Sequence, residues 1–266
     1  MPTVKVGDIN MYYEINGAGP PLLLIMGLGS DLSAWMFQIP DFSKKYQVVA
    51  FDNRGVGRTD APDKPSSVKM MADDTVGLMD ALRIDVAQIV GVSMGGFIAQ
   101  ELALKYPGRV KSLALVCTAA KSHPKCNSII SGWSAAVSDE VSAKTFVQLG
   151  LPYLFTDRFF EDQQMVQKAM EILSSNPYPP TVHGYARQVT ACIQHDTRAR
   201  LKAITVPTLV LVGKEDNLLP VKLSEELASL IPNAKLVVLD GGGHGFSAEI
   251  PDKFNKAVLE FLAEVA

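Results

Sequence analysis

The chain has 266 residues, enough for one large domain or for a domain with a sizeable insertion. Apolar residues make up 47% and charged residues 20%, as is usual for a globular protein, and the formal net charge is −3. This balance gives no reason to expect nucleic acid or an anionic membrane surface as a partner.

The beginning of the chain and its cysteines bear on the compartment. Residues 1–8 lack the basic region and apolar core of a signal peptide. The longest apolar stretch, at residues 20–29, is too short to span a bilayer and is interrupted by glycine. Cys117, Cys126 and Cys192 form an odd, scattered set that suggests neither a disulfide framework nor a zinc site. We therefore expect a cytoplasmic protein without membrane association.

The predicted elements alternate between strands and helices along most of the chain. Strands are expected at residues 3–9, 11–15, 22–25, 47–51, 89–92, 113–116, 208–212 and 235–239. Helices are expected at residues 67–82, from 94 to about 106, at 221–230 and at 252–265. Several strands are apolar on both faces, as in a sheet covered by helices on each side. The pattern predicts an α/β fold with a mostly parallel, doubly wound sheet of eight strands.

The segment 120–197 has a different character, with helix-like stretches and no clear strand. It holds eight aromatic residues: Trp133, Phe146, Tyr153, Phe155, Phe159, Phe160, Tyr178 and Tyr185. We predict that residues 1–119 and 198–266 form the core domain and that 120–197 form a helical cap over the sheet's carboxyl edge. Open α/β sheets bind their ligands at that edge. Trp133, Phe155 and Tyr185 are therefore our candidates for substrate contacts in the cap.

One serine stands between an apolar strand and a helix, with glycines two residues away on either side. The sequence is Gly91-Val92-Ser93-Met94-Gly95. In a strand–Gly-x-Ser-x-Gly–helix arrangement the chain turns so sharply that the serine takes strained backbone angles and neighbouring side chains would collide. Such a turn lifts the Ser93 hydroxyl to the top of the sheet. It leaves the Met94 N–H at a helix start, where the partial positive charge favours an oxyanion.

A serine hydroxyl needs a base beside it, and the base needs an acid that fixes its tautomer. In this arrangement they follow in the order serine, acid, histidine. Asp216 follows the strand that ends at 212, and His244 lies in the glycine-rich loop after the strand that ends at 239. We predict His244 as a base on a mobile loop and Asp216 as the acid. Glu215 is expected to point elsewhere and Asp240 to cap the loop.

The second oxyanion donor is expected in the loop after the third strand, which reads Met26-Gly27-Leu28-Gly29. We assign the Leu28 N–H to this role together with the Met94 N–H, and we expect Gly27 to lie beside the substrate. A plain turn is the alternative interpretation of Leu28. The same loop does not indicate a dinucleotide site, because position 32 is leucine where a third glycine is needed.

Other polar residues of the insertion have less definite settings. The histidines His123, His183 and His195 are predicted to be non-catalytic, although His123 follows a strand end and would be placed to line the pocket. The arginines Arg158, Arg187 and Arg198 either recognise a substrate carboxylate or form solvated cap surface. The chain has no P-loop and no metal-ligand spacing, so we expect chemistry without a cofactor or a metal ion.

With these residues, the chain resembles the α/β-hydrolase fold superfamily over nearly its whole length. Besides the serine motif, residues 52–59 are similar to the Asp-x-Arg-Gly-x-Gly-x-Ser turn of that superfamily, and 243–251 to its Gly-His-x5-Pro region. Asp52 and Arg54 are expected to brace the turn rather than touch substrate. The branch with 3-oxoadipate enol-lactonase and small carboxylesterases is most similar, because residues 184–186 and 195–201 resemble the end of its cap. Many of these relatives have His-Gly where this chain has Met26-Gly27.

The resemblance implies a serine hydrolase of carboxylic esters with small or medium acyl groups, acting through an acyl-enzyme. A serine nucleophile argues against dehalogenases and epoxide hydrolases, which use aspartate. Three alternatives stay open: an enol-lactonase acting on a keto-acid lactone, a perhydrolase side activity and a slow-turnover ligand receptor. The oligomeric state is not predicted. Because the base must be neutral, activity is expected to rise between about pH 6 and 8.

Overall fold

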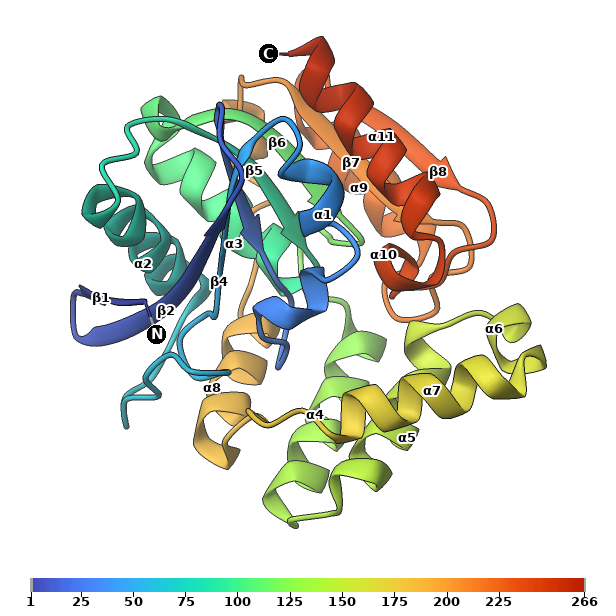
Figure 1. The fold of residues 1–266 in the computed structure, drawn as a ribbon. Coiled ribbons are helices and arrows are strands. Elements are labelled where there is room, and N and C mark those ends of the chain that lie inside the picture. Colours follow the sequence, from blue (N-terminus) through green and yellow to red (C-terminus); the bar gives the residue numbers. More distant parts are fainter. Residues whose placement is uncertain (1, 266) are drawn as a thin grey trace.

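Eight strands form one sheet in the computed structural model, which describes residues 2–265 (Figure 1). The strands are β1 (Thr3–Val6), β2 (Ile9–Asn16), β3 (Pro21–Ile25), β4 (Gln47–Phe51), β5 (Ala87–Val92), β6 (Val110–Val116), β7 (Thr208–Gly213) and β8 (Lys235–Leu239). Their order is β1-β2-β4-β3-β5-β6-β7-β8. The pairs β1–β2 and β2–β4 are antiparallel and all other pairs are parallel. The predicted eight-stranded, mostly parallel α/β fold is confirmed.

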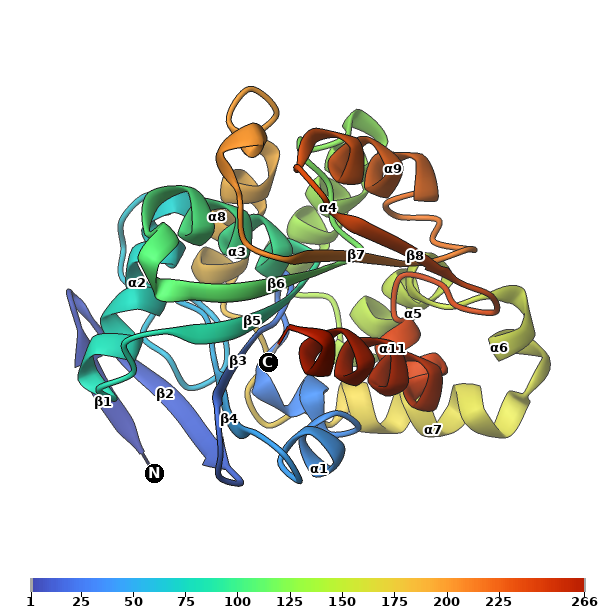
Figure 2. The same cartoon turned by 90° about the horizontal axis from the view of Figure 1, so that it is seen from above.

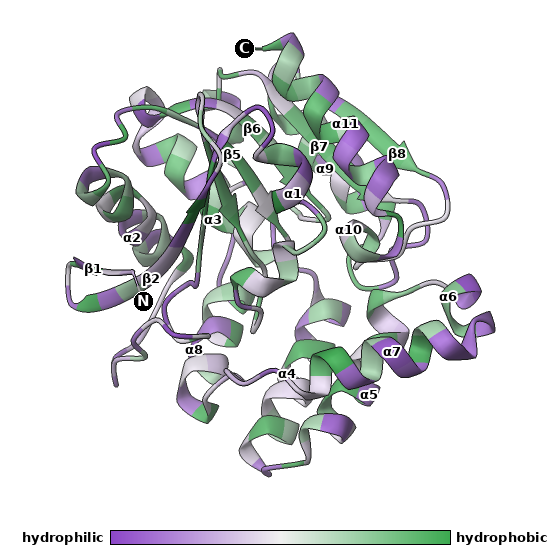
Figure 3. Ribbon diagram, viewed as in Figure 1, coloured by the Kyte–Doolittle hydropathy of each residue, from purple (hydrophilic) through white to green (hydrophobic). Residues whose placement is uncertain are grey.

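Helices cover both faces of this sheet (Figure 2). One face carries α2 (Val68–Ala81), α3 (Met94–Lys105) and α9 (Val221–Leu230), and the other carries α1 (Ile39–Phe42) and α11 (Pro251–Glu264). Successive strand residues point to opposite faces. Leu23 of β3 therefore packs in the cluster under α2 and α3, while Leu22 and Leu24 pack in the cluster under α1 and α11. This alternation explains why the central strands are apolar on both sides. Figure 3 shows the central strands coloured mainly as hydrophobic.

Two local features near the N-terminus differ from the sequence-based expectation. The turn between β1 and β2 lies at residues 7–8 rather than at 10, and Gly7 takes the positive φ of 53°. A short helix η1 (Leu32–Trp35) and α1 precede β4 where no helix was expected. Their buried residues Trp35 and Phe42 are fully inaccessible to solvent. Packing against the sheet specifies these helices, because four residues are too few to show a helical period.

The remaining helices lie between β6 and β7. They are α4 (Pro124–Ser138), α5 (Ala143–Leu154), α6 (Asp157–Glu161), α7 (Gln163–Ser174) and α8 (Val182–Ile193). Figure 1 shows α4 to α7 as a group below the sheet, with α8 at the same level beside α4. The two ends of this insertion lie side by side. They are joined by the hydrogen bond from Thr197 N to Ala120 O at 2.8 Å. The cap boundaries at 120 and 197 stay a prediction.

Three short helices complete the chain: η2 (Pro107–Arg109), η3 (Leu201–Ala203) and α10 (Phe246–Glu249). The other helix ends lie within about two residues of their expected positions. Helix α2 begins directly after Ser67, whose hydroxyl accepts the Met70 N–H at 3.2 Å and satisfies one free amide of the first turn. Within residues 2–265, none of the helices has the length and apolar character that crossing a bilayer requires.

Candidate active site

Ser93 occupies the tight turn between β5 and α3. Its backbone angles are φ 55° and ψ −116°, an unfavourable region for a residue other than glycine. A Cβ added at Gly91 would collide with the Gly95 carbonyl, and one added at Gly95 would collide with the Ile25 carbonyl. The turn is held by the hydrogen bond from Ser93 N to Val116 O at 2.9 Å. The strained turn and its two glycines thus place a partly exposed hydroxyl at the carboxyl end of β5.

His244 and Asp216 reach the same point from the loops after β8 and β7. His244 Nε2 lies 3.1 Å from Ser93 Oγ, and His244 Nδ1 lies 2.8 Å from Asp216 Oδ2. The other carboxylate oxygen of Asp216 accepts the N–H groups of Leu218 and Leu219 at 2.9 and 2.7 Å. With Nδ1–H donating to Asp216, the neutral imidazole keeps Nε2 as an acceptor for the serine proton. The structure therefore brings the three predicted residues into one hydrogen-bonded chain.

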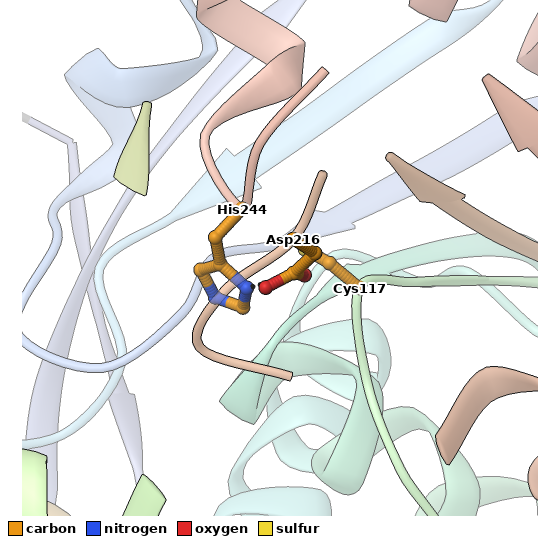
Figure 4. A group of neighbouring side chains, drawn as sticks. All are labelled: Cys117, Asp216 and His244. Carbon is orange, nitrogen blue, oxygen red and sulfur yellow. Dashed lines mark hydrogen bonds and ion pairs between the residues drawn. The ribbon is translucent and has the colours of Figure 1, made fainter. Parts of the chain in front are cut away.

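Cys117, at the end of β6, lies beside the acid and the histidine (Figure 4). One possible ligand atom from each of Cys117, Asp216 and His244 falls within 4.8 Å of the other two. Cys117 is fully buried, and this burial raises the pKa of its thiol well above the usual value. A neutral thiol is a poor metal ligand and a poor nucleophile. Cys117 is thus an uncharged neighbour of the Asp216–His244 hydrogen bond.

The loop after β3 lies directly against the serine. A Cβ added at Gly27 would lie 3.2 Å from the Ser93 Cβ, so a larger residue here would require the serine to shift by a few tenths of an ångström. Within residues 2–265, neither the Leu28 N–H nor the Met94 N–H donates to a protein acceptor. The Met94 amide directly follows the nucleophile and starts α3, a position suited to a developing oxyanion. The roles of the Leu28 and Met94 amides stay a prediction.

Two side chains hold this loop in place, and the sequence alone did not reveal either. Asn53 Nδ2 donates to Met26 O at 2.9 Å. Gln188, on α8 of the insertion, accepts the Gly29 N–H at 2.9 Å and donates to Arg54 O at the same distance. Gln188 lies three residues after Tyr185 on the same helix, so the two side chains share a helix face, and this spacing was a signal that Gln188 lies near the site. Its hydrogen-bond partners Gly29 and Arg54 are more than 130 positions away in the sequence, so the spacing could not identify them.

The aromatic candidates for substrate contacts lie at different places around the site. Tyr185 is buried, and its ring lies so close to Gly29 that a Cβ there would collide with it. Phe155 is buried near Gly245, where an added Cβ would lie 3.2 Å from its ring. Trp133, on α4, packs edge to face with Tyr153 of α5 at 5.8 Å between ring centroids. Tyr185 and Phe155 thus border the two loops of the site, and the substrate contacts of all three stay a prediction.

The other histidines and the arginines are placed as follows. His183 is exposed, His123 precedes α4, and His195 is 3% exposed with its ring stacked on Phe97 at 4.1 Å. The guanidinium groups of Arg187 and Arg198 pair with Asp63 and Asp196, and Arg158 is exposed on α6. The two paired arginines already have carboxylate partners in the protein, which argues against a role for them in binding an anionic substrate.

Asp52 and Arg54 brace the structure around the turn after β4. Asp52 accepts the N–H groups of Leu32 and Arg58, both at 2.8 Å. Its carboxylate therefore joins the turn after β4, which contains Arg58, to the segment after the β3 loop, which contains Leu32. Arg54 is 4% exposed and forms a two-pronged ion pair with Asp74 of α2 at 2.5 and 2.7 Å. This pairing agrees with an architectural role for both residues.

The comparison with known proteins agrees with this geometry. Residues 20–249 match the family described as alpha/beta hydrolase fold. The chain belongs to this family. It is therefore a hydrolase, and its substrates are small molecules. The expected resemblance to the branch that contains 3-oxoadipate enol-lactonase is confirmed as well.

Relatives within the family carry different activities in their names. A putative carbamate hydrolase RutD from Azorhizobium caulinodans is 34% identical over 268 residues, covering 100% of this chain and 99% of the relative. The crystal structure of the enol-lactonase from Burkholderia xenovorans LB400 has a TM-score of 0.88 at 30% identity, covering 98% and 100% of the two chains. A thermophilic esterase from Thermogutta terrifontis also has a TM-score of 0.88, at 28% identity, covering 100% and 99%.

Proposed function

We propose that this hydrolase cleaves uncharged carboxylic esters of small to medium acyl chain by a serine mechanism. The observation that supports it most strongly is the continuous hydrogen-bonded chain from Ser93 Oγ through His244 to Asp216. Nucleophile, base and acid lie within bonding distance before any substrate arrives, so little rearrangement precedes the first chemical step.

The acylation step follows from these contacts. Ser93 Oγ attacks the ester carbonyl carbon while His244 Nε2, at 3.1 Å, takes the hydroxyl proton. The Leu28 and Met94 N–H groups receive the negative charge that develops on the carbonyl oxygen. Asp216 stabilises the imidazolium, which then gives its proton to the departing alcohol as the carbon–oxygen bond breaks. Ser93 is left as an acyl ester.

Deacylation repeats the sequence with water as the nucleophile. His244 takes a proton from the water, whose oxygen attacks the acyl carbon, and the same two amides hold the oxyanion. The proton then returns to Ser93 Oγ as the acid leaves. The overall products are one carboxylic acid and one alcohol, and the enzyme is restored.

The preference for an uncharged substrate is supported by the charges around the cap. Arg187 and Arg198 pair with Asp63 and Asp196, so neither guanidinium offers an unpaired positive charge to a substrate carboxylate. The aromatic residues Tyr185 and Phe155 border the two loops of the site instead. Apolar surface of this kind is suited to a neutral acyl or alcohol group.

A lactone is the second candidate, because the enol-lactonase of Burkholderia xenovorans matches 98% of the chain at 30% identity. A panel of neutral esters, neutral lactones, anionic lactones and carbamates separates these substrate classes. We expect the highest kcat/KM on neutral esters. A preference for an anionic lactone or a carbamate would overturn the substrate assignment and leave the serine mechanism intact. Turnover below about one per minute on every substrate, with a ligand-dependent rise in melting temperature, would instead favour a ligand receptor that has kept a slow triad.

The direct test of the serine mechanism is Ser93→Ala assayed on a chromogenic short-chain ester. Loss of the nucleophile typically lowers turnover by about 10⁴- to 10⁶-fold. Ser138→Ala is a matched control, since Ser138 is an exposed residue near the end of α4. The control is expected to keep full activity, and a Ser93→Ala enzyme with more than about a tenth of the activity would refute the mechanism.

Two further expectations remain proposals. We place the protein in the cytoplasm, which is supported by three cysteines that are all free and buried, as in a reducing compartment. We also place the cap between residues 120 and 197, which is supported by the bridge between Lys121 and Asp196 where the insertion begins and ends.

A further inference from the structure

The backbone amides on both sides of His244 are bonded to groups outside their loop. Gly243 N donates to Glu249 Oε2 at 3.0 Å, and Gly245 N donates to the Leu154 carbonyl oxygen at 2.6 Å. Because both flanking N–H groups have fixed partners, the backbone that carries the imidazole is restrained on either side. The glycine-rich loop was expected to carry a mobile imidazole; in the structure the N–H groups of Gly243 and Gly245 are both bonded.

Close packing by the insertion explains why these positions are glycines. A Cβ added at Gly243 would lie 2.7 Å from Leu154 O and 3.2 Å from the Phe155 Cα. A Cβ added at Gly245 would lie 3.2 Å from Leu154 O and from the Phe155 ring. Any side chain here would push the end of α5 away from the loop. The glycines thus let the segment Leu154–Thr156 lie against the backbone of the histidine.

Glu249 connects the same two parts of the chain through its carboxylate. One oxygen accepts the Gly243 N–H, and the other accepts both the backbone N–H of Thr156, at 3.1 Å, and the Thr156 hydroxyl. Thr156 is 2% exposed and lies directly before α6 of the insertion, 93 positions before Glu249. Hydrogen bonds to an ionised acceptor are stronger than neutral ones, so three of them make a firm connection.

We propose that Glu249 is a positioning residue for His244. By bonding Gly243 and Thr156 at once, it holds the histidine loop against the insertion and keeps the imidazole in line between Ser93 and Asp216. The inference rests on the proposed function for the role of His244 as the base. On this proposal the insertion does more than cover the site. Through Leu154 and Thr156 it also fixes the position of the histidine in the proton relay.

Two substitutions test this role at different bonds. Glu249→Gln keeps the size of the side chain but replaces one carboxylate oxygen by an NH2 group, which cannot accept a hydrogen bond. The remaining amide oxygen can accept from Gly243 or from Thr156 but not from both, so the connection between the two segments is broken. Thr156→Val removes only the hydroxyl bond and keeps the backbone N–H bond. A misplacement of about 1 Å at a reacting group can cost about 10²-fold in rate. We expect Glu249→Gln to lower kcat by about 10- to 100-fold with KM nearly unchanged, and Thr156→Val to lower kcat less.

The far-downfield proton resonance of the His244 Nδ1–H supplies a readout that does not depend on turnover. This proton bonds to Asp216 at 2.8 Å, and we expect its resonance to broaden or disappear in Glu249→Gln. A variant that is merely less stable would keep the resonance in its folded fraction. Glu226→Gln, a change at an exposed residue of α9, is the matched control for charge and should change neither kcat nor the resonance.

The outcomes separate this inference from the proposed function. If no ester is cleaved but the resonance is lost in Glu249→Gln, the positioning role stands and the proposed chemistry fails. If wild-type protein cleaves esters and folded Glu249→Gln keeps both kcat and the resonance, the positioning role is overturned. Should Glu249→Gln fail to fold, Thr156→Val decides, and wild-type kcat together with an unchanged resonance in that variant would overturn the proposal.

Discussion

The free energy of unfolding is expected to depend on pH through one buried histidine. His195 follows α8 and is 3% exposed, with its ring stacked on Phe97 at 4.1 Å. Neither ring nitrogen has a hydrogen-bond partner within residues 2–265. Burial away from water disfavours the imidazolium and lowers the pKa of His195 to about 4, and the nearby ion pair of Glu101 and Arg200 contributes less.

The size and sign of the effect follow from this shift. A fall from 6.5 to about 4 corresponds to about 3 kcal/mol, at about 1.4 kcal/mol for each unit of pKa. The folded pKa lies below the unfolded one, so between pH 6.5 and 4 the unfolded chain binds a proton that the folded chain does not. The free energy of unfolding should therefore be highest above about pH 6.5 and fall as the pH drops through this window.

Urea unfolding between about pH 7 and 4.5 measures this dependence in wild type and in His195→Phe, which keeps an aromatic ring against Phe97. The variant should lose most of the dependence in this window. His183→Gln, a change at an exposed histidine, is the control and should follow wild type. Asp8 and Asp196, whose pKa values lie near 2 because of their cationic partners, lose their contribution mainly below the window. An unchanged pH slope in His195→Phe would refute the reasoning.

Three other substitutions have definite expected outcomes. Asp216→Asn should lower kcat on an ester by about 10⁴-fold, because the amide favours the wrong imidazole tautomer, and a loss below tenfold would contradict its role as the acid. Asp74→Asn removes the buried, two-pronged partner of Arg54 and leaves it only the more exposed Asp8 at 3.1 Å, so urea unfolding should show a loss of about 3 kcal/mol, and a loss below about 1 would show that the pair is not needed. Gly95→Ala places a Cβ on the Ile25 carbonyl, so activity should fall sharply. Gly132→Ala, with open space around its Cβ on α4, should retain activity, and equal activity in both variants would contradict the strained turn.

The parts of the fold that follow from sequence are those with a strong local pattern. The central strands are apolar on both faces, and Ser67 marks the start of α2 by accepting an amide of its first turn. Ser93, Asp216 and His244 were recognisable because each follows a strand and the order of the three is fixed by the resemblance. Since parallel strands bring their carboxyl ends to one edge, this information was enough to place the three residues together.

The parts that sequence did not reveal depend on contacts between distant segments. Trp35 and Phe42 specify two short helices only through packing against the sheet. Apart from its spacing from Tyr185, nothing in the local sequence distinguishes Gln188 from other polar residues. Its role depends on the packing of α8 against the loop after β3, where its partner Gly29 lies 159 positions earlier in the chain. Glu249 was visible as part of a motif, but its bonds to Thr156 require the insertion to be folded over the histidine loop. Local pattern cannot encode such pairs.

The most direct test of the account is covalent labelling by a phosphonate ester that stops after the first step. We predict one adduct per chain, mapped by peptide mass spectrometry to Ser93, with labelling lost in Ser93→Ala and strongly slowed in His244→Ala. The phosphonyl oxygen of the adduct would occupy the position between the Leu28 and Met94 amides. Rapid, stoichiometric labelling of another residue, or undiminished labelling of Ser93→Ala, would contradict the claim that Ser93 is the nucleophile of this hydrolase.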